Sequence, residues 1–147
     1  MRIRVIHIYS SVVYYKSYRM YFFIIVRRFP EYALMCTQLG TQMLLYPGAF
    51  NMTTGPAHWE LLQRGRAVDN QCYVATCSPA RRMESSYHAW GHSTIVGPWG
   101  DVVATTEHDP AVVVAELDFQ KVADMRQNIP VLHQKRTDLY SLTASSQ

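Results

Sequence analysis

The sequence predicts an α/β fold in which helices pack in layers against a sheet. Two observations carry this prediction. Short apolar runs of strand length alternate with longer segments whose apolar residues recur at helical spacing. Glycine, proline and polar residues stand between these segments, where turns are expected. The chain has 147 residues, 48% of them hydrophobic and 17% charged, which is enough for one globular unit with its own core.

The first two elements of this body are a helix and a strand. A helix is predicted over residues 31–39, because Pro30 suits its first turn and Gly40 ends it. A short apolar strand over 43–46 follows and stops at a Pro-Gly pair.

The remaining elements alternate in the same way. In order, they are a turn-rich loop at 51–56, a helix over 58–71, a strand over 72–76, a polar loop at 78–84, two strands over 93–96 and 102–105, and a strand over 112–117. The Gly-Pro-Trp-Gly-Asp sequence at 97–101 predicts that the two strands beside it pair as a hairpin. Asp118 is suited to cap a last helix, which ends near Asn128 before Pro130.

The start of the chain differs from the rest in charge. The first 28 residues hold six basic side chains and no acidic one, whereas residues 29–147 hold 8 basic and 11 acidic ones, a net −3. We therefore expect a divergent head at 1–26, a body at 27–140 and a tail at 141–147. The basic head has two interpretations, a mitochondrial targeting segment or a divergent start of the chain.

Several classes of protein are disfavoured by composition. Three cysteines without framework spacing favour a reduced compartment, and so a cytoplasmic protein, with the mitochondrion left open by the head. No apolar run approaches the ~20 residues of a membrane helix, so no membrane partner is expected. The scattered charge of the head does not indicate a nucleic-acid partner. His88 and His92 lack a third nearby ligand, so no metal is expected.

Eight motifs follow one another through most of the chain. They read Arg-Phe-Pro-Glu at 28–31, Tyr-Pro-Gly-Ala-Phe-Asn at 46–51, Thr-Thr-Gly-Pro-Ala-His-Trp-Glu at 53–60, Arg-Gly-Arg-Ala-Val-Asp-Asn-Gln at 64–71, Ser-Pro-Ala-Arg at 78–81, Trp-Gly-His-Ser-Thr at 90–94, Gln-Asn-Ile-Pro-Val at 127–131 and Gln-Lys-Arg-Thr-Asp-Leu-Tyr at 134–140. In order and spacing they resemble the second half of eukaryotic omega-amidases, members of the nitrilase (carbon–nitrogen hydrolase) superfamily. The resemblance is specific because so many segments agree in register.

The resemblance implies a fold and an activity. The fold would be about half of the family's four-layer α-β-β-α sandwich, which would leave the apolar strand faces at 43–46, 72–76 and 112–117 without cover. The activity would be hydrolysis of ω-amides of 2-oxo acids (2-oxoglutaramate, 2-oxosuccinamate) to the dicarboxylic acid plus ammonia, without a cofactor. In this family a cysteine thiolate attacks the amide carbon, a glutamate is the general base and a lysine stabilises the oxyanion.

The reacting centre departs from that pattern. The family's Cys-Tyr-Asp-x-Arg-Phe sequence, laid on Arg28 and Phe29, puts Ile24 at the nucleophile position. Ile24 has no nucleophilic atom, and the family's glutamate and lysine have no counterpart in this sequence. Cys36 is expected to be a small core residue, and the other two cysteines lack a partner in the sequence that would activate them. We therefore expect no catalytic residue and no turnover by this chain alone.

Three residues are candidates for substrate binding. Related amidases have an arginine beside the nucleophile, so Arg28 either faces a substrate carboxylate or is an ordinary surface charge. Phe50 and Thr54 follow the second matching strand, where the family builds the wall of its pocket. Their alternative interpretation is ordinary turn structure.

Two functions of different classes remain open. The chain is either an amidase with the family's activity on small 2-oxo acid amides, or a non-catalytic fragment or isoform that associates with a full-length subunit. The resemblance implies a homo-oligomer, such as a homodimer, with contacts from the helix at 31–39 and from residues 131–140. Alternatively, the head completes a small autonomous sheet with a replacement strand at 22–26.

Overall fold

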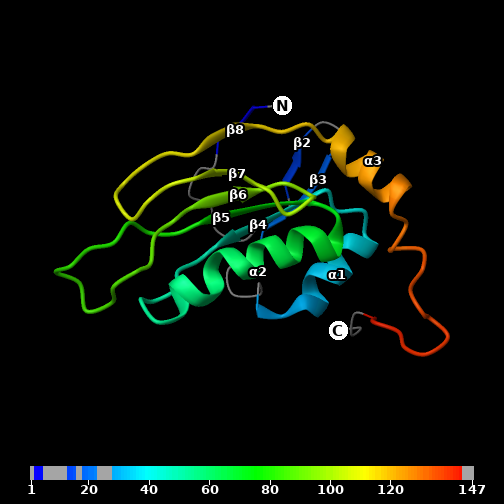
Figure 1. Ribbon diagram of the computed structural model, residues 1–147, viewed down its shortest axis with the longest axis horizontal. Coiled ribbons are helices and arrows are strands. Elements are labelled where there is room, and N and C mark those ends of the chain that lie inside the picture. The colour runs from blue at the N-terminus through cyan, green and yellow to red at the C-terminus, as the bar shows by residue number, and fades with distance from the viewer. Residues whose placement is uncertain (1, 5–12, 16–17, 23–27, 144–147) are drawn as a thin grey trace.

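The computed structural model describes residues 2–4, 13–15, 18–22 and 28–143 (Figure 1). A six-stranded sheet runs through it in the order β2-β3-β4-β5-β6-β7. Its strands are β2 (Val13–Tyr15), β3 (Tyr18–Phe22), β4 (Met43–Pro47), β5 (Tyr73–Cys77), β6 (Thr94–Val96) and β7 (Val102–Thr105). Strands β3, β4 and β5 are parallel, and the other neighbours pair antiparallel. The carboxyl ends of the three parallel strands therefore lie at one edge of the sheet.

Helices α1 (Pro30–Gln38) and α2 (Thr54–Asn70) cover one face of this sheet (Figure 1). In β4, β5 and β6, alternate residues point to these helices, as expected for the two-residue period of a strand. The buried cluster on this face consists of Ala33, Cys36, Leu44, Tyr46, Ala67, Cys72, Val74 and Val96. The two helices are also joined by a buried hydrogen bond, which the Thr37 hydroxyl donates to Asn70 Oδ1 over 3.1 Å.

The opposite face of the sheet is covered by β8 (Val114–Glu116) and α3 (Gln120–Asn128). Strand β8 pairs antiparallel with β1 (Arg2–Arg4). The cluster on this side consists of Met43, Leu45, Tyr73, Ala75, Ile95, Ala115, Leu117, Phe119 and Val122. The Arg126 guanidinium fixes α3 by donating to the Thr41 carbonyl over 2.6 Å. The predicted layered α/β fold is confirmed.

The expectation of uncovered strand faces is wrong for β4 and β5. Met43 and Val74 are fully buried and Ala75 is 1% exposed, because helices cover one face while β8 and α3 cover the other. Exposure remains on the outer side of β8, where Val114 is 55% exposed.

Most element boundaries differ from those predicted by one to four residues, and the starts of α2 and β5 have a visible cause. Helix α2 begins at Thr54 rather than at 58, because the Asn51 side chain accepts the backbone N–H groups of Thr53 and Thr54. Strand β5 begins one residue late, because the chain is still closing α2. Gln71 adopts a left-handed conformation (φ 49°), and the Cys72 N–H donates to the Ala67 carbonyl over 3.2 Å.

The head contributes strands to both sheets, through β1 on one and β2 and β3 on the other. Of the replacement strand expected at 22–26, residues 23–26 lie outside the described part, and Phe22 is the last residue of β3, which pairs with β4 from Met20 to Phe22. None of the described helices is long and apolar enough to cross a membrane.

Candidate active-site wall

The loops that follow β4 and β5 come together at the carboxyl edge of the parallel strands. The Trp90 N–H donates to the Phe50 carbonyl over 2.7 Å, and Asn51 forms an isolated β-bridge with Ala89. Near the strand ends, the Gly48 N–H donates to the Cys77 carbonyl over 2.9 Å. In open α/β sheets this edge is where ligands usually bind.

Arg28 and Phe50 are in contact at this edge. The guanidinium carbon of Arg28 lies 4.4 Å from the centre of the Phe50 ring, a cation–π arrangement. The Phe50 side chain is 9% exposed, and its ring meets Trp59 edge-on, with centroids 5.6 Å apart. Arg28 itself is exposed. The exposed Arg28 guanidinium therefore packs on a buried aromatic ring, that of Phe50.

Thr54 is the first residue of α2 and belongs to a capping cluster. Its hydroxyl donates to Asn51 Oδ1 over 3.0 Å, and its backbone N–H donates to the same oxygen over 2.9 Å. Asn51 also accepts the Thr53 N–H over 3.1 Å, so one amide oxygen holds the first turn of the helix. This cluster fixes the position of Thr54 four residues after Phe50.

Trp90 packs tightly against this turn. A Cβ atom on Gly55 would lie 2.3 Å from the Trp90 side chain, so only glycine fits at position 55. The Trp90 ring also stacks on His92, with centroids 4.4 Å apart and an interplanar angle of 24°. The main chain of His92 accepts a hydrogen bond from Trp59 Nε1. Trp59 and Trp90 thus join the two loops from both sides.

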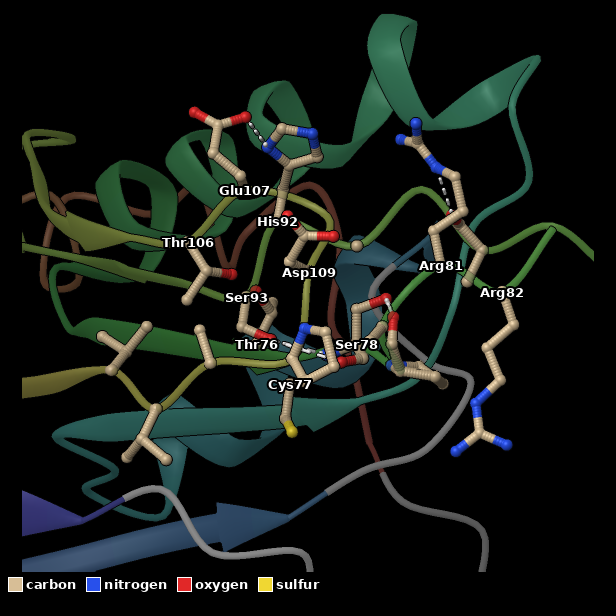
Figure 2. A pocket seen from close by; sticks show the side chains of 18 of the residues that line it. Thr76, Cys77, Ser78, Arg81, Arg82, His92, Ser93, Thr106, Glu107 and Asp109 are labelled. Atoms are coloured by element: carbon tan, nitrogen blue, oxygen red, sulfur yellow. Dashed lines mark hydrogen bonds and ion pairs between the residues drawn. The ribbon is translucent and has the colours of Figure 1, made fainter.

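A pocket of about 630 Å³ opens beside this junction, between the loop after β5 and the segment that leads to β8 (Figure 2). Thr76, Cys77, Ser78, Arg81, Arg82, His92, Ser93, Thr106, Glu107 and Asp109 are among the residues that line it. The Ser78 N–H donates to Ser93 Oγ over 3.0 Å and ties two sides of the pocket together. Arg28, Phe50 and Thr54 do not line it.

The pocket does not assemble a cysteine-based catalytic group from its described residues. His92 Nδ1 lies 4.0 Å from Glu107 Oε2, but Figure 2 shows the Cys77 sulfur pointing away from both. Burial raises the pKa of the Cys77 thiol, against a smaller lowering by a hydrogen bond with Ser93. Burial likewise raises the pKa of Cys36 to about 11 and that of Cys72 to about 12. The thiolate forms of all three are therefore disfavoured near neutral pH.

Ile24, at the expected nucleophile position, lies outside the described residues. Within the described part of the chain, no three His, Cys, Asp or Glu side chains gather closely enough to hold a metal ion. The sequence did not single out Asn51 or Trp90 for the roles they play here. The Trp-Gly-His and Phe-Asn motifs marked their positions, but only tertiary structure shows that the two loops meet.

Comparisons with known proteins identify relatives of this chain. The profile of the carbon-nitrogen hydrolase family matches residues 23–127. Omega-amidase NIT2 of Pongo abelii is 62% identical over 115 residues, which make up 78% of this chain and 42% of that protein. The chloroplastic omega-amidase of Arabidopsis thaliana is 58% identical over 115 residues, 78% of this chain and 31% of that protein.

The fold is shared with a solved structure of the same superfamily. Saccharomyces cerevisiae Nit3, a member of branch 10 of the nitrilase superfamily, superposes with a TM-score of 0.81 and 44% identity, over 88% of this chain and 48% of that one. The nitrilase-like fold class predicted from the sequence is confirmed. The chain spans less than half of the length of each of these relatives. From the family match over most of its length, this chain belongs to the carbon–nitrogen hydrolase family.

Proposed function

We propose that this chain provides one wall of an omega-amidase-type site for ω-amides of 2-oxo acids, and that it does not hydrolyse them on its own. The omega-amidase relatives support the substrate class. The observation that carries the proposal is the Arg28 guanidinium, held 4.4 Å above the Phe50 ring at the edge where the two loops meet.

The chemistry of this wall suits a small acid that carries an amide. A guanidinium binds a carboxylate through two parallel N–H···O bonds, and each substrate of this class carries one carboxylate. The Phe50 ring beneath Arg28 limits the orientations of the guanidinium, so less freedom is lost on binding. Because the Thr54 hydroxyl already donates its proton to Asn51, its free lone pairs are suited to accept an N–H of the substrate amide.

The second part of the proposal concerns hydrolysis. The family's nucleophile position corresponds to Ile24, and the raised thiol pKa values of Cys36, Cys72 and Cys77 argue against a replacement among them. We propose that turnover requires association with a full-length amidase subunit, and that the chain otherwise forms homo-oligomers. Three free cysteines favour the cytoplasm as the location, with the mitochondrion as the alternative raised by the basic head.

One experiment tests binding and turnover together. Calorimetric titration of the purified chain with 2-oxoglutaramate is expected to show saturable binding, while an ammonia assay on the same samples stays at the level of heat-killed protein. Arg28→Gln should weaken binding at least about tenfold, because a charge-assisted contact is lost. Arg64→Gln is the control, since Arg64 lies ten residues after Thr54 on α2 and bonds Glu60 of the same helix and Gly100 of the turn between β6 and β7.

Two results would contradict the proposal. Ammonia release by the unmodified chain would show that turnover needs no partner. Equal affinity of the unmodified chain and the Arg28 variant would remove Arg28 from the site.

A further inference from the structure

Arg81 has an unusual set of contacts for an arginine. Its Nε donates to the Ala89 carbonyl over 3.1 Å, and its Nη2 donates to the Trp90 carbonyl over 2.9 Å. Its guanidinium carbon also lies 5.3 Å from the centre of the Trp90 ring. The backbone N–H of Arg81 donates to the His108 carbonyl over 2.8 Å. The contacts with Ala89 and Trp90 close the long loop between β5 and β6 onto its own far end, and the bond to His108 ties the loop to the segment between β7 and β8.

That far end of the loop carries the contacts to the Arg28 side of the site. Trp90 donates its N–H to the Phe50 carbonyl, and its ring is held against Gly55 on the first turn of α2. Phe50 in turn supports Arg28 from below. A continuous series of contacts therefore runs from Arg81 through Trp90 and Phe50 to Arg28.

We propose that Arg81 is a positioning residue for the Arg28–Phe50 pair. It does not contact the substrate itself. It acts by fixing the main chain of residues 89 and 90, to which the Phe50 loop is hydrogen-bonded. The inference rests on the proposed function for the role of Arg28 and Phe50 in binding substrate. The positioning of Arg28 by Arg81 can be observed without a ligand. A planar guanidinium is needed because two carbonyl oxygens are held at once, which a single ammonium group does less well.

The test uses NMR of the full 147-residue chain labelled with ¹⁵N. The Arg28 Nε–H signal, assigned by its loss in Arg28→Lys, is expected upfield because the guanidinium lies over an aromatic ring. Arg81→Gln should move that signal back toward the position of an unstacked arginine, and should weaken 2-oxoglutaramate binding about tenfold. Arg81→Lys should give a smaller change of both.

Arg64→Gln is the matched control. Arg64 also uses its Nε to hold a main-chain carbonyl, that of Gly100 over 2.8 Å, but it lies away from the two loops. Its replacement should therefore leave both the Arg28 signal and the affinity unchanged. If the loss of any such arginine disturbed the site by lowering stability, Arg64→Gln would also change the Arg28 signal. A change seen only in the Arg81 variants therefore indicates a specific effect of Arg81.

The possible outcomes separate the two proposals. A folded Arg81→Gln protein with an unchanged Arg28 signal overturns the positioning role. A shifted signal in Arg81→Gln, together with no binding of 2-oxoglutaramate by the unmodified chain, supports the positioning role and overturns the proposed function. If Arg81→Gln does not fold, Arg81→Lys decides, and an unchanged Arg28 signal in that variant overturns the inference.

Discussion

Gln63, on the buried side of α2, has a side-chain amide that lacks a hydrogen-bond partner at both ends among the described residues. The residue is 0% exposed, so both polar atoms have lost their contact with water. An unsatisfied buried polar group costs about 1–3 kcal/mol. We therefore expect Gln63→Met, which keeps the length of the side chain, to raise the free energy of unfolding by about 1 kcal/mol. Urea titration followed by circular dichroism measures this difference.

Gln71 is the matched comparison. It is also buried, at 1% exposed, and its Oε1 also lacks a partner among the described residues, but its Nε2 donates to the Ile129 carbonyl over 2.6 Å. Gln71→Met removes a formed hydrogen bond that links the end of α2 to the end of α3, and should lower stability by about 1 kcal/mol. We therefore predict that the two substitutions change the free energy of unfolding in opposite directions. A Gln63 variant as destabilised as the Gln71 variant would show that Gln63 is satisfied by a contact such as a buried water.

At the scale of elements, the start of α2 depends on one side chain. Asn51 Oδ1 accepts three hydrogen bonds, from Thr53 N–H, Thr54 N–H and the Thr54 hydroxyl. Asn51→Ala should therefore lower the free energy of unfolding by about 1 kcal/mol, as for other helix caps. Asn51→Asp keeps the acceptor and places a negative charge at the helix N-terminus, so its stability should equal or exceed that of the unmodified chain. Unfolding in urea checks both variants, and an alanine variant as stable as the unmodified protein would contradict the capping role.

The same cap shows how far the sequence predicts this fold. The apolar runs at 43–46 and 72–76 were correctly assigned to strands, because burial on both faces leaves a continuous apolar signal. Helix α2 begins four residues before the predicted start, because Thr53 and Pro56 resemble a turn when the bonds to Asn51 are unknown. Helix starts depend on such side-chain contacts more than on periodicity.

The candidate site also contains residues that the sequence predicts and residues that it does not. Arg28 and Phe50 were proposed from a family resemblance, and the structure places them in contact. The roles of Trp90 and Arg81 could not be predicted, because they depend on a contact between loops that lie about forty residues apart in the sequence. No local pattern in the sequence records a contact over that separation.

On the scale of the whole molecule, apolar side chains remain exposed outside the core. Val112 is 77% exposed and Val114 is 55% exposed on and before β8, while Leu139 and Tyr140 near the C-terminal end are 70% and 56% exposed. Exposed valines two residues apart, at and just before the start of a short strand, favour association with another chain. These residues stand among the segments that the sequence already indicated for association.

We therefore expect the chain to self-associate, with a melting temperature that rises with protein concentration. Sedimentation velocity and thermal melts over a hundredfold dilution measure this, because stability that is linked to a partner must depend on concentration. Val112→Lys combined with Val114→Lys should shift the protein toward the monomer, since a charge at the start of β8 and another just before it oppose strand pairing. Leu61→Lys, on the outer side of α2 and 66% exposed, is the control and should leave the sedimentation profile unchanged. A cooperative melt of a monomer that is identical at every concentration would show instead that the head strands complete the fold, and that this chain is stable without a partner.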